Sequence, residues 1–159
     1  MSITIEQEYP DTPEIVALVD ELTAILSAPY PPESVHGYSV QKLIDQQVAF
    51  FVIRVDGTAA GCGGVQLIHD AGSESYGELK RMYVRAAFRG MGLAKKMIAV
   101  LEAHTRDNGI DLLRLETGIF SAEAIGLYQR MGFYEIGPFG DYTLDPNSRY
   151  FERRIEARI

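Results

Sequence analysis

The chain has 159 residues, of which 47% are hydrophobic and 23% are charged, as expected for one globular domain (1–159) with a single core. The net charge of −7 argues against nucleic acid as the main partner, because neutralising phosphates requires clustered lysine and arginine. A membrane partner is not expected either. No apolar run approaches the roughly 20 residues that cross a bilayer, and residues 1–13 lack the cationic and apolar regions of a signal peptide. The single cysteine, Cys62, cannot form an internal disulfide and favours a reducing, cytoplasmic location.

The first quarter of the chain predicts a short strand and two helices. Residues 3–5 alternate as in a strand, and residues 11–14 (Asp-Thr-Pro-Glu) give a helix start with a capping residue and an early proline. Helical spacing of the apolar residues that follow predicts that one face packs on the core: Ile15, Leu18, Val19, Leu22, Ile25 and Leu26. After a proline-rich loop, Ser39 is placed to cap a second, short helix.

The middle of the chain predicts a β-hairpin. Two apolar runs, residues 48–55 and 58–68, are joined by Asp56-Gly57, the strongest short signal for a hairpin turn. Gly61, Gly63 and Gly64 lie inside the second run, where glycine indicates a bulge or a close backbone approach.

The second half predicts strands that alternate with helices. A strand at 78–84 leads through a glycine turn into a helix from Leu93 to Asn108, and a strand at 112–117 follows, parallel to the first because a helix crosses between them. A helix near 122–131 and strands at 134–136 and 150–155 complete the chain. The fold class is therefore α/β, a mixed sheet with helices on both faces.

The turn between the strand at 78–84 and the long helix has the composition of an anion site. Gly90 and Gly92 allow the backbone to approach a ligand and to adopt positive φ. The first N–H groups of the helix have no partner within it, and the helix dipole adds positive character there. Arg89 adds a fixed charge, so a polyphosphate is expected. The turn lacks the Gly-Lys-Ser/Thr of a mononucleotide loop and the surroundings of a dinucleotide fingerprint.

Residues 77–133 resemble the GNAT superfamily of acetyl-CoA-dependent N-acetyltransferases. Arg89-x-x-Gly92-x-Ala94 matches the pyrophosphate loop of that superfamily. Residues 121–133, which include Leu127-Tyr128 and end in Gly132-Phe133, match its second motif. Ser121 stands where that motif usually has asparagine. Outside this window, residues 30–34 and 138–142 resemble a large bacterial branch of the superfamily.

The resemblance implies acetyl-CoA as co-substrate and no metal. The residues it assigns to acetyl-CoA are Met82, Tyr83, Val84, Arg89, Gly90, Met91, Gly92, Leu93, Ala94, Lys95, Ser121 and Tyr128. Among these, the backbone amides of residues 82–84 are expected to polarise the thioester carbonyl. Tyr128 is expected to be the general acid, because a phenol stays protonated at neutral pH and can give its proton to the departing thiolate.

The base that deprotonates the acceptor amine has three candidates. Glu78 starts the central strand, at the substrate end of the cleft in the family that the chain resembles. Glu116 lies within the neighbouring strand, an unusual place for a carboxylate. A water molecule is the third. Substrate contacts are expected from Tyr30, Glu33, Glu116 and Tyr142.

The function expected from this resemblance is transfer of an acetyl group to a primary amine of a small molecule, by direct attack in a ternary complex. A non-catalytic acetyl-CoA sensor and an acetyltransferase acting on a protein amine are the alternatives. The apolar C-terminal segment, Tyr150 to Ile159, makes a homodimer possible. The three histidines do not have the spacing of a metal site.

Overall fold

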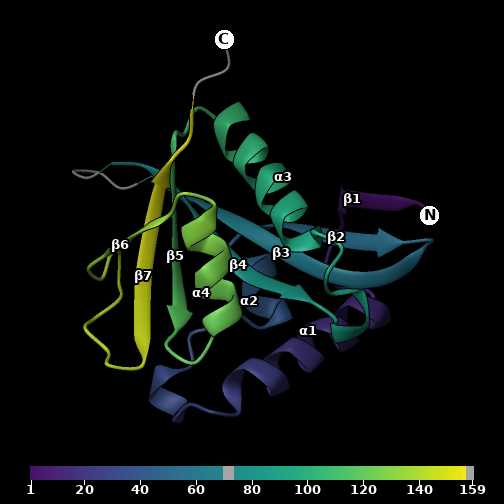
Figure 1. The fold of residues 1–159 in the computed structure, drawn as a ribbon, viewed down its shortest axis with the longest axis horizontal. Coiled ribbons are helices and arrows are strands. Elements are labelled where there is room, and N and C mark those ends of the chain that lie inside the picture. The colour runs from purple at the N-terminus through teal and green to yellow at the C-terminus, as the bar shows by residue number, and fades with distance from the viewer. Residues whose placement is uncertain (70–73, 157–159) are drawn as a thin grey trace.

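A mixed β-sheet flanked by helices on both faces forms the protein in the computed structural model, which describes residues 1–69 and 74–156 (Figure 1). The strands are β1 (Ile3–Gln7), β2 (Ala49–Val55), β3 (Thr58–Ile68), β4 (Tyr76–Val84), β5 (Leu112–Gly118), β6 (Tyr134–Ile136) and β7 (Ser148–Arg154). The helices are α1 (Pro13–Ser27), α2 (Val40–Asp45), α3 (Leu93–Asp107) and α4 (Ala122–Arg130), with 3-10 turns η1 (Pro32–Ser34) and η2 (Ala86–Phe88).

The strands lie in the order β1-β2-β3-β4-β5-β7-β6. Neighbouring strands are antiparallel except β4 and β5, which are parallel. A parallel pair needs a crossover connection, and α3 provides it. The predicted fold class, a mixed sheet with a parallel pair at its centre, is confirmed.

Two apolar layers hold the helices to the sheet. Buried residues of α1 and α2 pack with Phe50, Val52 and Cys62 on one face. Buried residues of α3 and α4 pack with Phe51, Ile53 and other strand residues on the opposite face. Phe50 and Val52 face one layer and Phe51 faces the other, because successive side chains of a strand point to opposite faces of the sheet.

The local signals in the sequence are matched closely. Asp56 and Gly57 both have positive φ in the hairpin turn, and Gly109 and Gly132 have positive φ just after α3 and α4, as helix-ending glycines do. The residue that caps α1 is Thr12, whose side chain accepts the hydrogen bond from the Ile15 N–H at 3.3 Å.

The prediction that Ile25 and Leu26 pack on the core was wrong. They are 50% and 41% exposed, whereas Ile15, Leu18, Val19 and Leu22 are buried as expected. The last turn of α1 runs past the edge of the apolar layer and borders a cavity instead. Helical periodicity tells which face turns inward but not where the covering layer ends.

The apolar residues of the C-terminal segment, which suggested a possible homodimer, lie inside the chain itself. Strand β7 lies between β5 and β6, and Tyr150, Phe151 and Ile155 are buried within the chain. These apolar residues therefore complete the core of the chain itself. Residues 157–159 lie outside the described part. In the part that is described, no helix has the length and apolar character required to span a bilayer.

The sheet opens at its centre, and this opening positions the functional site. In the part of the chain that the structure describes, β4 and β5 pair only at Gly77 with Leu113 and at Glu78 with Arg114. Beyond these pairs the two strands diverge, so the edge of β4 from Leu79 onward has no ladder partner on the β5 side. Backbone N–H and C=O groups on that edge are left available for a ligand.

Candidate active site

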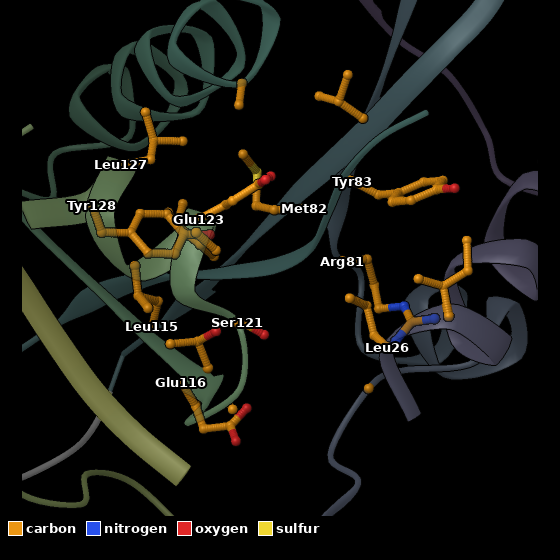
Figure 2. A pocket seen from close by; sticks show the side chains of 18 of the residues that line it. Leu26, Arg81, Met82, Tyr83, Leu115, Glu116, Ser121, Glu123, Leu127 and Tyr128 are labelled. Carbon is orange, nitrogen blue, oxygen red and sulfur yellow. The ribbon is translucent and has the colours of Figure 1, made fainter. Parts of the chain in front are cut away.

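A cavity of ≈ 980 Å³ lies between the diverging halves of β4 and β5 (Figure 2). It runs along β4 to the glycine turn and the start of α3, and α4 and the loop after α1 form further walls. The predicted site residues that line it are Tyr30, Met82, Tyr83, Val84, Arg89, Gly90, Gly92, Leu93, Ala94, Lys95, Glu116, Ser121, Tyr128 and Tyr142. Three predicted residues are not among its lining: Glu33, Glu78 and Met91.

The glycine turn has the geometry expected of an anion site. Gly90 and Gly92 have φ of +85° and +72°, a region that costs other residues about 1–2 kcal/mol. The first backbone bond into α3 runs from the Lys96 N–H to the Gly92 carbonyl at 3.2 Å. The amides of Leu93, Ala94 and Lys95 therefore have no partner in the helix. The positive end of the helix dipole lies at the same place.

Tyr128 is buried on the inner side of α4 and faces the cavity (Figure 2). Its ring packs edge-to-face on Phe133, with the centroids 5.6 Å apart. Burial raises the pKa of the Tyr128 phenol above its ordinary value, so the hydroxyl is protonated throughout the neutral range. Within residues 1–69 and 74–156 no side chain or carbonyl is hydrogen-bonded to this hydroxyl, which leaves it available to a ligand.

Glu116 projects into the same cavity from β5 (Figure 2). Burial raises the pKa of its carboxyl group. The Ser148 hydroxyl donates a hydrogen bond of 2.8 Å to Glu116 Oε2 and opposes that rise, as does the positive charge of Lys80. The raised pKa brings the carboxylate closer to the range where a general base is effective.

Glu78 lies in a buried, hydrogen-bonded position away from the cavity wall. It is buried, and its Oε2 accepts hydrogen bonds from Lys80 Nζ at 2.7 Å and from the Tyr142 hydroxyl at 2.6 Å. Its two partners line the cavity, but Glu78 does not. Because a buried carboxylate must be paired, Glu78 fixes the positions of Lys80 and Tyr142.

Loops that are distant in sequence are joined beside the cavity. The hydroxyl of Tyr30 accepts a hydrogen bond of 2.9 Å from the Phe120 N–H, and the two rings lie 5.4 Å apart. A Cβ atom at Gly118 would lie 2.0 Å from the Tyr30 oxygen, so glycine leaves room for this contact. In addition, Ser34 bonds to Asp145 at 3.2 Å.

Cys62 is not placed to act as a nucleophile. It lies on β3 within the layer under α1, and its thiol donates a hydrogen bond of 3.3 Å to the Arg81 carbonyl. Burial raises the pKa of the thiol to about 12, so the reactive thiolate is scarce at neutral pH. Among the residues that the structure describes, no group of three or more His, Cys, Asp and Glu side chains gathers as metal ligands do.

Several lining residues were missed by the sequence analysis. Lys80, Arg81 and Tyr38 form part of the wall next to β4, and Phe120 and Glu123 part of the opposite wall. A signal for Lys80 and Arg81 was present, because Gly63 and Gly64 indicated a bulge or a close backbone approach in the neighbouring strand. That signal did not tell which side chains of β4 the bulge would turn.

Comparison with known proteins identifies the family to which the chain belongs. Residues 15–133 match the model of the acetyltransferase (GNAT) family. The chain belongs to the GNAT family. It is 38% identical to an IAA acetyltransferase of Azospirillum brasilense over 97% of this chain and 99% of that protein. The YsnE N-acetyltransferase of Bacillus subtilis is 30% identical over 89% and 93% of the two chains.

Solved structures of GNAT proteins share the fold. A Klebsiella pneumoniae protein classed as an acyl-CoA N-acyltransferase has 33% identity and a TM-score of 0.79, covering 97% of this chain and 98% of that one. The PaiA N-acetyltransferase of Thermoplasma acidophilum, crystallised with coenzyme A, has a TM-score of 0.76 and 20% identity, covering 97% and 99%. This GNAT protein is therefore an acyltransferase that uses an acyl-CoA as co-substrate. The unpaired amides at the glycine turn and the cavity that continues between β4 and β5 fit such a molecule.

Proposed function

We propose that this GNAT protein transfers the acetyl group of acetyl-CoA to a primary amine of a small molecule by direct attack in a ternary complex. The observation that carries the proposal is one continuous cavity, which has the anion site at the glycine turn, the Tyr128 phenol and the Glu116 carboxylate on its walls. A pyrophosphate, a thioester and an amine therefore have a place in the same space. Alignment of two reactants in this way can supply about 7–11 kcal/mol of the barrier.

The pyrophosphate end is assigned to the turn before α3. The unpaired amides at this turn, with the charges of Arg89 and Lys95, would hold the pyrophosphate. The backbone edge of β4 at residues 82–84 would bind the pantetheine arm and polarise the thioester carbonyl. Ser121 would add a hydroxyl at the start of α4. The residues so assigned are Met82, Tyr83, Val84, Arg89, Gly90, Met91, Gly92, Leu93, Ala94, Lys95 and Ser121.

The chemical step is assigned to residues on opposite sides of the thioester. Glu116, directly or through a water molecule, accepts a proton from the acceptor ammonium. The neutral nitrogen then attacks the carbonyl carbon, so that the C–N bond forms and the C–S bond breaks. Tyr128 gives its proton to the leaving sulfur, and the second proton of the amine restores the phenol. The acceptor gains the acetyl group, and the free thiol of coenzyme A is released.

Glu116 is preferred to Glu78 as the base for two reasons. Glu116 lines the cavity, and its carboxyl group has a raised pKa. Glu78 does not line the cavity, and it is held in an ion pair with Lys80 at 2.7 Å in which both side chains are buried. Glu78 is proposed instead to position Lys80 and Tyr142.

The joined loops support a small acceptor over a protein. The contact between Tyr30 and Phe120 and the bonds of Ser34 to Asp145 and Asn147 tie together the loops around the acceptor end. A peptide would need an open groove in which to lie extended. A compact acceptor that enters between Tyr30, Tyr142 and Glu116 has no such requirement.

Binding of acetyl-CoA is tested by a thermal melt with and without the ligand. At about a hundred times its dissociation constant, a ligand adds roughly 2.7 kcal/mol of stability. In a chain of this size the melting temperature should rise by about 5–10 °C. ADP and NAD are the controls. A rise with NAD but none with acetyl-CoA would contradict the assignment of the glycine turn and, with it, the proposed function.

A further inference from the structure

A bulge in β4 turns two neighbouring cations to the same face of the sheet. The register between β3 and β4 shifts between the pairs Cys62–Tyr83 and Gly64–Lys80, and Arg81 has a φ of +53°. An extra residue in one strand breaks the alternation of side chains. Lys80 therefore contacts the ring of Tyr38, and Arg81 reaches Val19 and Thr23 of α1, both on the face that α1 and α2 cover.

Arg81 has no acidic partner among the described residues. Its Nη2 donates hydrogen bonds to the Val19 carbonyl and the Thr23 hydroxyl, and its Nε is buried without a hydrogen-bond partner. Its Nη1 lies under Gly37, where a Cβ atom would be 1.8 Å away. Arg81 and Gly37 both line the cavity. A partly buried guanidinium with unused donors and no counter-ion favours an anion from outside the chain.

Lys80 is the neighbour of Arg81. Two of the three N–H donors of its ammonium have oxygen acceptors among the described residues. Its Nζ donates to Glu78 Oε2 at 2.7 Å and to the Tyr142 hydroxyl at 3.2 Å, and it sits 4.0 Å from the centroid of the Tyr38 ring. Glu78 balances the charge of Lys80, so the uncompensated charge on this wall is that of Arg81. The rings of Tyr38 and Tyr142 make the surroundings aromatic.

The opposite wall carries the opposite charge. Figure 2 shows Arg81 on the β4 side of the cavity and Glu116 on the β5 side. An acceptor with an ammonium group and an anionic group would therefore find a complementary partner on each wall. On Arg81 the donor left for such an anionic group is Nη1, because Nη2 is bonded to α1 and Nε is buried; a hydrogen bond from a guanidinium to a carboxylate is charge-assisted and therefore strong.

We propose that the acceptor is an amine that also carries a carboxylate, of the amino-acid class, and that Arg81 is the residue that selects it. The carboxylate binds to the guanidinium of Arg81 next to Lys80, while the amine faces Glu116. This inference rests on the proposed function and adds the substrate class. It makes Arg81 a specificity-determining residue rather than a participant in acyl transfer.

The test compares matched acceptors in the wild type and in Arg81→Gln. Release of the coenzyme A thiol from acetyl-CoA is followed with a panel of amino acids, each paired with its decarboxylated amine, such as phenylalanine with phenethylamine and lysine with cadaverine. The wild type should prefer the best amino acid over its decarboxylated partner by about 10- to 100-fold in kcat/KM, the range expected of a hydrogen bond to a charged group. Arg81→Gln should remove most of this preference, mainly through KM, and should change kcat/KM for the decarboxylated amine by less than about threefold.

Thr23→Val is the matched control, because it removes the hydrogen bond that anchors Arg81 to α1 and keeps the charge. If Arg81 served only to hold α1, both variants would lower the melting temperature and reduce activity on both acceptors by the same factor, and the inference would be overturned. Equal or better turnover of the decarboxylated amines by the wild type would also overturn it, with the proposed function intact. If no amine of either kind is acetylated, the proposed function fails together with the inference.

Discussion

Replacing Tyr128 with phenylalanine is expected to lower kcat by about 100-fold or more, the usual contribution of a general acid. The change removes one hydroxyl that faces the cavity and has no hydrogen-bond partner in the described chain, and it keeps the ring that packs on Phe133. The fold and the acetyl-CoA site should therefore be unchanged. Turnover is measured by release of the coenzyme A thiol, and acetyl-CoA binding by the rise in melting temperature.

Tyr134→Phe is the control for this experiment. It removes the same atom from an exposed tyrosine on β6, whose hydroxyl bonds to Glu152, and it should leave kcat within about twofold of the wild type. Unchanged turnover in Tyr128→Phe would remove Tyr128 from the mechanism. If acetyl-CoA no longer raised the melting temperature of Tyr128→Phe, Tyr128 would be a binding residue instead.

Replacing Glu116 with glutamine is expected to have opposite effects on activity and stability. As the proposed base, Glu116 should contribute about 100-fold or more to kcat, and the variant should lose that factor. At neutral pH the variant should melt at a higher temperature than the wild type, because it removes a carboxylate that burial disfavours in its charged form.

The pH dependence of this stability difference follows from the raised pKa of Glu116. The folded state holds the proton more tightly than the unfolded state, so Glu116 favours folding below its unfolded pKa and loses that contribution as pH rises through its folded pKa. Glutamine stays neutral throughout. The gap in melting temperature between Glu116→Gln and the wild type should therefore grow from acidic to neutral pH.

Glu6→Gln is the matched control, since Glu6 is an exposed residue of β1. It should leave both kcat and the pH dependence of the melting temperature close to those of the wild type. A wild-type rate in Glu116→Gln would remove Glu116 as the base. In that case Glu78 or a water molecule would be the remaining candidate.

The parts of the site that could be predicted depend on backbone conformation. Gly90 and Gly92 indicate their turn through the positive φ that glycine tolerates, and the helix that follows supplies its amides by geometry alone. The Asp56-Gly57 turn sets the hairpin in the same way. Such signals are local, so a single sequence contains them in full.

The parts that could not be predicted depend on where side chains meet in space. Glu78 was proposed as a base from its place at the start of a strand, but its hydrogen bond with Tyr142 forms only when the loop after β6 folds over β4. The orientation of Arg81 depends on a bulge whose register no local pattern specifies. A hydrogen bond between residues 64 positions apart in the sequence, as from the Tyr142 hydroxyl to Glu78, is a property of the fold.

The most direct test of the central claim is a two-substrate initial-rate measurement with acetyl-CoA and the best acceptor amine. Direct attack requires both molecules in the cavity at once, so double-reciprocal plots at several fixed amine concentrations should intersect. No thiol should be released without the amine, because Cys62 is buried and its pKa is raised to about 12. Parallel lines, with a burst of thiol in the absence of amine, would indicate an acetylated enzyme and would contradict the ternary complex proposed for this cleft.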